Sequence, residues 1–126
     1  MPFTYHIDSE AGILFVVGEG EITQAERLET MRAWLKDKAY RPGLPTLCDF
    51  SAASSTPSLP ELRTIVDFIE QHAASIGPKK VAMVTAKPST FGVARQFQAL
   101  VDSGPVQAKV FTDRVAALAW LCEGNH

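Results

Sequence analysis

The sequence predicts an α/β fold, a mixed sheet of about five strands with four helices in the order ββαβαβαβα. The first observation is that hydrophobic periodicity switches repeatedly between the strand and helix periods along the chain. The second is that hydroxyl caps and Gly-Pro pairs separate these segments. The third is size, because 126 residues with 46% hydrophobic content suit one core. We therefore expect a single domain over residues 1–126.

The chain opens with a predicted β-hairpin. Residues 3–8 alternate apolar and polar side chains, which is typical of an edge strand with one wet face. Residues 13–18 are apolar on both faces, as expected of an interior strand. The glycine in residues 9–12 suits the turn between them, so the two strands should pair antiparallel.

The first predicted helix runs from about Gln24 to Lys38. Thr23 and Glu26 have the spacing of a capping box at its start. Its expected buried face comprises Ala25, Leu28, Met31 and Leu35.

A short buried strand and a second helix follow. Residues 46–50 form the strand, and residues 51–58 form a loop rich in serine. Ser58 and Glu61 make a second capping box, and the helix should stop at Gly77. Its expected buried stripe comprises Leu62, Ile65, Val66, Ile69, Ala73 and Ile76.

The last part of the chain continues the alternation. Residues 80–85 are a strand, and Ser89 is expected to cap a third helix that ends before Gly104. The apolar side of this helix comprises Phe91, Ala94, Phe97 and Val101. Residues 108–112 form the final strand, and residues 114–122 form an almost wholly apolar helix capped by Asp113, which must lie against the core.

Three loops should meet at one edge of the sheet. They cover residues 51–58, 87–90 and 112–113, each of which follows a strand in the parallel part. In open α/β sheets this carboxyl edge is where ligands and functional residues collect. The edge is therefore the first place to look for a site.

Composition narrows the classes of partner. The chain has 12 basic and 14 acidic residues with no long block of either sign, so neither nucleic acid nor a membrane surface is an expected partner. No charged-then-apolar leader and no apolar run of about 18 residues is visible, which predicts a soluble protein. The two cysteines do not have the spacing of a disulfide framework, which favours a cytoplasmic setting. Cys48 and Cys122 are too far apart for a metal knuckle, and the three histidines have no ligand spacing. We expect no metal and no cofactor.

A resemblance to a known family rests on three stretches of the chain. "YRPGLPTLCDFS" has a Pro-Gly turn before a strand that ends in Asp, "FGVARQF" has Arg after Phe-Gly, and "VFTDRVAALAWL" is an Ala-rich helix ending in Trp-Leu. The chain resembles the STAS family, the sulfate transporter and anti-sigma factor antagonist domains with the SpoIIAA-like fold, and within it a group of uncharacterised bacterial proteins. The resemblance implies a nonenzymatic regulatory or protein-interaction domain.

The same resemblance implies a switch serine after the strand that ends in Asp. The candidate phosphoacceptors are Ser54, Ser55 and Ser58, whose phosphate would lie near a helix N-terminus, with Lys87 as a cationic partner. The alternative is that Ser58 caps the helix while the other serines keep a loop soluble.

Five residues are candidates for a ligand or partner edge, namely Asp49, Ser51, Lys87, Ser89 and Arg95. The favoured interpretation is structural for two of them, with Asp49 accepting hydrogen bonds from loop amides and Arg95 forming an ion pair. No nucleophile, acid and base converge in the sequence, so no catalytic residue is predicted.

Two functions from different classes remain open. The first is the regulatory or interaction domain, whose partner would be a protein. The second is a carrier of a small apolar ligand or lipid, because the SpoIIAA-like fold is shared with CRAL-TRIO domains and the chain is rich in Phe, Ile and Val. A homodimer is a further prediction, based on the apolar residues 13–17 and on Trp34, which lies beside the expected buried stripe.

Overall fold

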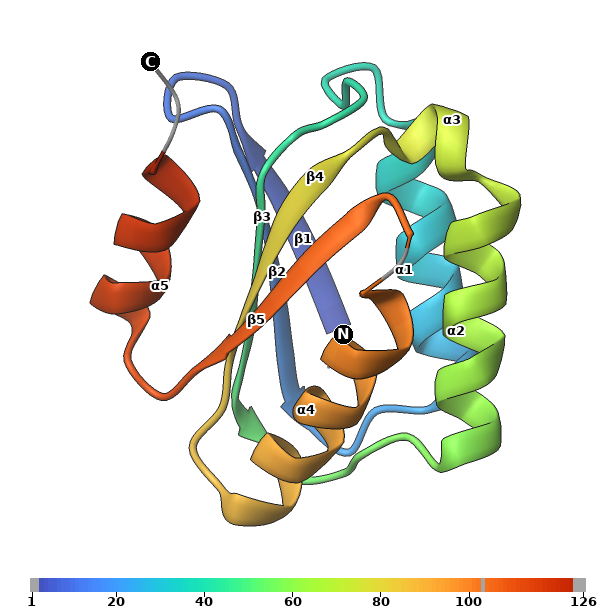
Figure 1. Cartoon of the computed structure of the whole chain (residues 1–126), viewed down its shortest axis with the longest axis vertical. Coiled ribbons are helices and arrows are strands. Elements are labelled where there is room, and N and C mark those ends of the chain that lie inside the picture. Colours follow the sequence, from blue (N-terminus) through green and yellow to red (C-terminus); the bar gives the residue numbers. More distant parts are fainter. Residues whose placement is uncertain (1–2, 103, 124–126) are drawn as a thin grey trace.

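The computed structural model of the chain describes residues 3–102 and 104–123. It contains a sheet of five strands in the order β1-β2-β3-β4-β5. The elements are β1 (Phe3–Asp8), β2 (Ile13–Gly20), α1 (Gln24–Lys36), β3 (Thr46–Ala53), α2 (Leu59–Gln71), α3 (Ala73–Ile76), β4 (Lys79–Val84), α4 (Pro88–Val101), β5 (Val106–Phe111) and α5 (Arg114–Cys122) (Figure 1). The predicted mixed α/β order is confirmed, with the short α3 as an additional helix.

Strand direction sets the layers of the molecule. β1 pairs antiparallel with β2, and β2 to β5 are parallel neighbours. Each crossover leads to the next strand in the same direction, so right-handed connections place every crossover helix on the same face. α1, α2 and α4 accordingly lie on one side of the sheet, and α5 lies alone on the other (Figure 1).

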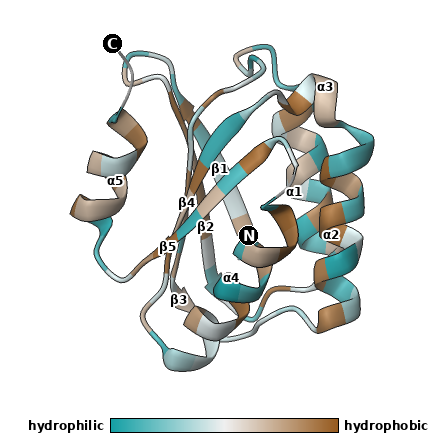
Figure 2. Cartoon of the chain, in the orientation of Figure 1, coloured by the Kyte–Doolittle hydropathy of each residue, from teal (hydrophilic) through white to brown (hydrophobic). Residues whose placement is uncertain are grey.

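Each face of the sheet has its own hydrophobic cluster. Hydrophobic residues run along the strands, and α2 alternates hydrophobic and hydrophilic residues (Figure 2). On the helix-rich face the cluster includes Leu14, Val16, Trp34, Ile65, Ile69, Val81 and Met83. On the other face α5 packs on β3, β4 and β5. This smaller cluster comprises Leu47, Ala82, Val84, Ala117, Trp120 and Leu121.

Local capping accounts for where the helices begin. Both predicted capping boxes are present, with Thr23 and Glu26 at α1 and Ser58 and Glu61 at α2. The Asp113 side chain accepts a hydrogen bond from the amide of Val115 at 3.1 Å, as predicted for α5. These caps satisfy amides that the first helical turn leaves without a partner.

The prediction that Ser89 caps α4 is wrong. The helix begins at Pro88, Lys87 is the N-cap residue without a side-chain cap, and Ser89 lies within the first turn. The reason is that proline has a helical φ and no amide hydrogen to satisfy, so it starts a helix readily.

The end of β3 and the end of the second helix also differ from the predicted positions. β3 extends to Ala53, beyond the predicted residue 50, because Ala52 and Ala53 pair with the end of β2. The second helix ends at Gln71 and resumes as α3 after His72.

The buried side of α1 was predicted in part, because Leu28, Met31 and Leu35 are partly buried and pack against the core. Ala25 is exposed. Trp34, expected beside the buried stripe, is only 6% exposed. The buried face of α1 therefore extends beyond the predicted stripe to Arg27 and Trp34, which are its two most buried residues. One reason for expecting exposed apolar surface is thus removed, and the homodimer stays a prediction.

Gly77 is a point where the backbone leaves no room for a side chain. Its φ is +74°, and a Cβ would lie 2.5 Å from the amide nitrogen of Gly43. Gly43 itself donates a hydrogen bond to the carbonyl of Ile76 at 2.8 Å, which joins the α3–β4 turn to the loop before β3. Gly20 has a similar φ of +63°, but a Cβ there meets nothing within 4 Å.

We expect Gly77→Ala to destabilise the protein far more than Gly20→Ala. Both changes add the strain of a left-handed residue, about 1 to 2 kcal/mol, and only Gly77→Ala adds a backbone clash. The free energy of unfolding, measured with denaturant, should fall by about 3 kcal/mol or more for Gly77→Ala. Equal losses for the two variants would contradict the packing of this turn.

Candidate functional site

A cavity of about 160 Å³ lies between the sheet and helices α1, α2 and α4. Most of its wall is apolar, with aliphatic or aromatic side chains from β2, β3, β4 and the three helices. Met31 and Met83 are among them. Their unbranched side chains can adapt to an occupant, which rigid β-branched residues cannot do as easily.

The polar residues of the wall are hydroxyl-bearing or basic. Its hydroxyl groups come from Thr46, Ser55, Thr56 and Thr90. Its charged residues are Arg27 and Lys79, and no Asp or Glu of the described chain lines the cavity. Both charged residues of the wall are therefore basic, which favours an anionic rather than a cationic group in an occupant.

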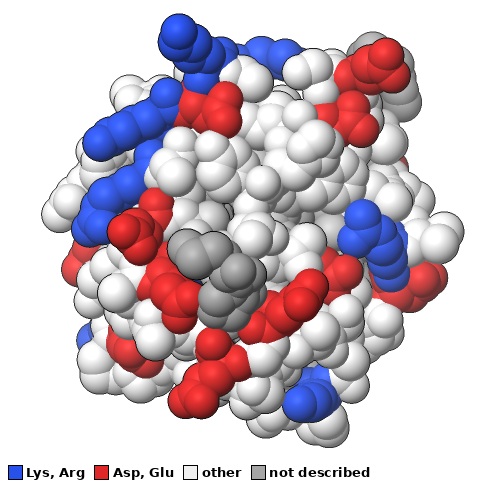
Figure 3. Space-filling model, turned by 180° about the vertical axis from the view of Figure 1, so that it is seen from behind, with Lys and Arg blue, Asp and Glu red and all other residues white. Residues whose placement is uncertain are grey.

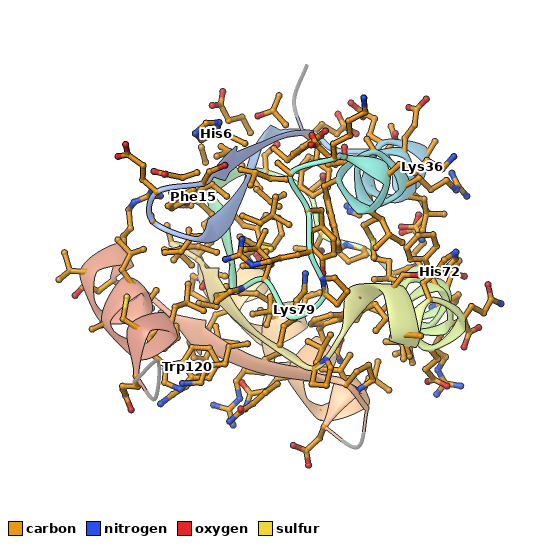
Figure 4. The ribbon with its side chains drawn as sticks, turned by 90° about the horizontal axis from the view of Figure 1, so that it is seen from above. His6, Phe15, Lys36, His72, Lys79 and Trp120 are labelled. Carbon is orange, nitrogen blue, oxygen red and sulfur yellow. The ribbon has the colours of Figure 1, made fainter. Side chains whose placement is uncertain are left out.

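Lys79 is the most unusual residue of this wall. It is the first residue of β4 and shares the helix-rich face with Val81 and Met83, because side chains alternate along a strand. Only 7% of Lys79 is exposed. In the view along the sheet it lies in the interior between strands and helices, whereas His6, Lys36 and His72 lie at the periphery (Figure 4).

An aromatic cage surrounds the Lys79 amine. Its Nζ lies 4.1 Å from the ring centroid of Trp34 and 5.0 Å from that of Tyr40. Nζ donates a hydrogen bond to Tyr40 Oη at 3.3 Å, and Tyr40 Oη donates to the carbonyl of Ile76 at 2.7 Å. The ring faces attract the cation, and within the described chain Tyr40 Oη is the one hydrogen-bond acceptor that Lys79 Nζ reaches.

Burial shifts the protonation of three neighbouring groups toward their neutral forms. It lowers the pKa of Lys79 to about 7. It raises the pKa of the Cys48 thiol and of the Tyr40 phenol, each to about 12. At neutral pH the thiol and the phenol are thus protonated and uncharged, and Lys79 is the group in this cage that titrates.

The neighbouring Lys80 has more hydrogen-bond acceptors for its amine than Lys79 has. It points to the opposite face, where its Nζ donates to the carbonyls of Trp120 and Glu123 at 3.1 and 2.9 Å. These carbonyls end α5, so the charge also meets the negative end of a helix dipole. The two adjacent lysines therefore differ in their hydrogen bonds, because Lys80 has two carbonyl acceptors and Lys79 has one phenol oxygen.

Arg27 is the second basic group of the cavity wall. It is 8% exposed, and its guanidinium donates to Gln24 Oε1 at 3.3 Å. Burial lowers its pKa, and the nearby carboxylates of Glu61 and Glu26 oppose that shift. Arg27 therefore has acidic neighbours for its charge, which distinguishes it from Lys79.

The serine loop borders the cavity, and its serines differ in environment. Ser54 is exposed. Ser55 Oγ accepts a hydrogen bond from the amide of Ile22 at 2.8 Å and donates to the Ile22 carbonyl at 3.2 Å. Ser58 accepts from the amide of Glu61 in the α2 capping box. Ser55 and Ser58 have structural roles, and the phosphoacceptor assignment stays a prediction. Ser54 and Ser58 are both exposed, but the Ser58 side chain is engaged in the helix cap, so Ser54 fits the prediction best.

The predicted partner edge is only partly assembled. Asp49 Oδ1 accepts hydrogen bonds from the amide and hydroxyl of Ser51, at 3.0 and 2.6 Å. Its Oδ2 pairs with Arg114 at 3.2 Å, the one ion pair among the described residues. Lys87, Ser89 and Arg95 are exposed, and the structural ion pair considered for Arg95 is not among the contacts of the described chain.

Sequence reasoning missed both basic residues of the cavity. The signal for Lys79 was the alternation of "KKVAMV", which continues the Val81 and Met83 face back to Lys79 once the strand is started one residue earlier. The signal for Arg27 was its spacing from Met31 and Trp34, but a charged residue on a buried helix face is not expected.

The surface charge, the metal-binding residue types and the length of the helices bear on other kinds of site. Acidic and basic side chains both occur on the rear face, with uncharged surface between them (Figure 3). No group of His, Cys, Asp or Glu within residues 3–102 and 104–123 is arranged to hold a metal ion. None of the helices in the same part of the chain combines the length and apolar character needed to cross a membrane.

The arrangement defines an α/β domain with a mixed sheet whose crossover helices share one face. Among solved structures, an uncharacterized protein of the DUF3478 family from Shewanella loihica PV-4, with a SpoIIAA-like fold, is similar to the chain. It shares 18% identity, covers 95% of this chain and 92% of its own, and superposes with a TM-score of 0.61. The chain therefore has a SpoIIAA-like fold, as its sequence resemblance implied. No protein-family model matches the sequence, and no curated protein does.

We expect Ser55→Ala to destabilise the protein by about 1 to 2 kcal/mol, because it leaves the half-buried amide of Ile22 without its acceptor. Ser54→Ala is the matched control and should change the free energy of unfolding by less than about 0.5 kcal/mol, since its side chain is exposed. Denaturant unfolding of both variants measures the difference. Indistinguishable stabilities would show that Ser55 does not join these loops.

We expect the stability of the protein to rise with pH just above neutrality. Lys79 has a pKa of about 7 when folded and 10.5 ordinarily, so the unfolded chain binds more protons between these values. The free energy of unfolding should then increase by up to about 1.4 kcal/mol per pH unit from about pH 7 to pH 8.5. Cys48 acts in the opposite sense only above its ordinary value of 9.0.

Lys79→Met tests this assignment, because it should abolish that slope. Lys109→Met is the matched control, since Lys109 is exposed on the opposite face of the sheet. Denaturant unfolding at several pH values provides the slopes. A slope retained in Lys79→Met would assign the titration to another group.

Proposed function

We propose that the chain is a nonenzymatic domain of STAS type that acts by binding a small, largely apolar molecule. The observation that supports this most is the cavity of about 160 Å³ between the sheet and helices α1, α2 and α4. Protein interiors are normally packed with few voids larger than water. An apolar cavity of about 150 Å³ in another protein stays dry and takes benzene, so this volume suits a compact occupant.

The chemistry of the wall favours binding over catalysis. Cys48, the one thiol among the residues lining the cavity, is protonated because burial raises its pKa to about 12. A thiol is a poor nucleophile, since the thiolate is the reactive form. Catalysis also needs a nucleophile, an acid and a base in mutual reach, and the described residues of the wall do not present such a set.

The serine loop contributes residues both to the cavity wall and to the protein surface. Ser55, Thr56 and Pro57 line the cavity, and Ser54, directly before them, is exposed. A molecule that contacts this wall therefore also contacts the loop that a protein partner would meet. The regulatory and the ligand-binding hypotheses are compatible on this basis, with the ligand as the signal and the loop as its readout.

We expect toluene and 1-hexanol to bind in the cavity. In a methyl-resolved NMR titration, shifts should be confined to residues of its wall, such as Ile22, Ile65 and Ile69. Methyl groups of Leu47 and Leu121, in the cluster under α5, should not move and serve as an internal control.

Ala94→Leu supplies the matched variant. Ala94 lines the cavity, so the larger side chain should occupy its volume and remove the shifts. Ala119→Leu adds the same atoms at an exposed position of α5 and should leave binding intact. Shifts spread over both faces, or none at all, would argue against ligand binding.

A further inference from the structure

We propose that the molecule bound in the cavity is a small apolar monocarboxylate, and that Lys79 holds its carboxylate. This inference rests on the proposed ligand-binding function and adds the chemical class of the ligand and the residue that recognises it.

The first argument is charge balance. A buried ammonium group is strongly disfavoured unless a counter-ion or hydrogen-bond acceptors replace water. No acidic residue of the described chain lines the cavity. Arg27 is near Glu26 and Glu61, whereas no carboxylate near Lys79 acts on its protonation. An occupant with one negative charge would supply the missing partner.

The second argument is hydrogen-bond geometry. A protonated lysine has three N–H donors. Tyr40 Oη takes one of them at 3.3 Å, and the described chain offers Nζ no second acceptor. The rings of Trp34 and Tyr40 flank the amine at 4.1 and 5.0 Å, and Lys79 and Trp34 are among the residues that line the cavity. A carboxylate, with two acceptor oxygens, matches the donors that remain.

The third argument is size and polarity. A cavity of about 160 Å³ takes a body of roughly six to eight non-hydrogen atoms, by comparison with cavities known to hold benzene. The wall away from Lys79 is formed mainly by side chains such as Val81, Met83 and Ile69. A short aliphatic or aromatic acid satisfies both the apolar wall and the single amine, and a long-chain lipid is too large.

Binding should also take up a proton near neutral pH. Unoccupied Lys79 has a pKa of about 7, and an adjacent carboxylate would hold it in its charged form. The other titratable groups of the cage, Tyr40 and Cys48, have pKa values of about 12 and stay neutral in this range. Arg27 stays charged throughout. A pH dependence between about 7 and 9 therefore reports on Lys79.

The test compares three six-carbon probes, hexanoate, 1-hexanol and hexylamine, by calorimetry and NMR on the full chain. We expect hexanoate to bind roughly tenfold or more tightly than 1-hexanol at neutral pH, and hexylamine most weakly. The affinity for hexanoate should fall by roughly tenfold per pH unit above about pH 7, while that for 1-hexanol should not change.

Variants assign the effect to a residue. Lys79→Met replaces a buried charge with an apolar side chain of similar length, which folded proteins commonly tolerate. It should abolish the preference for hexanoate and its pH dependence while retaining 1-hexanol, and Lys109→Met should behave as wild type. If the preference is lost in Arg27→Met and kept in Lys79→Met, the assignment to Lys79 is overturned.

The outcomes separate this inference from the proposed function. Binding of 1-hexanol with an equal or weaker affinity for hexanoate would overturn the carboxylate inference and leave the ligand-binding function standing. Stronger binding of hexylamine than of hexanoate would do the same. Failure of all three probes to bind would overturn both.

Discussion

The handedness of the strand connections is the constraint on which the rest of this structure depends. β2 to β5 are parallel neighbours in chain order, so each right-handed crossover places its helix on the same face. Three helices share that face and α5 lies on the other (Figure 1). The cavity lies on the helix-rich face, between the twisted sheet and these three helices. Their side chains do not fill all of the space there, whereas protein interiors are normally closely packed.

Within that layer the burial of Lys79 is the unusual feature. A strand at this position would ordinarily carry an apolar residue facing the helices, like Val81 and Met83. The amine is accommodated by Trp34 and Tyr40, and burial lowers its pKa to about 7. Natural folds keep such unfavourable groups mainly where function requires them, and the proposed ligand recognition would account for the lysine and the cavity together.

The fold could be predicted because most of its elements begin or end at short sequence patterns. Both capping boxes, the Asp113 cap and the hairpin turn depend on residues a few positions apart, and all are present. Local signals failed where distant residues decide. β3 continues to Ala53 because the end of β2 pairs with it, and Trp34 is buried because the sheet and Tyr40 lie against it. The serine loop begins at Ser54 rather than at the predicted residue 51, and the bonds of Ser55 to Ile22 join segments far apart in sequence.

The sequence by itself determined the order of strands and helices and the SpoIIAA-like resemblance, because periodicity and capping are short-range properties of a chain. It also determined that no run of charge dominates the molecule. Only the tertiary structure decided that Lys79, Trp34 and Tyr40 meet, and that Lys79, Trp34 and Arg27 line one cavity. The physical reason is that burial and the pKa of a side chain depend on what surrounds it in space, and residues from β4, α1 and the loop before β3 are brought together only when the sheet and its helices pack.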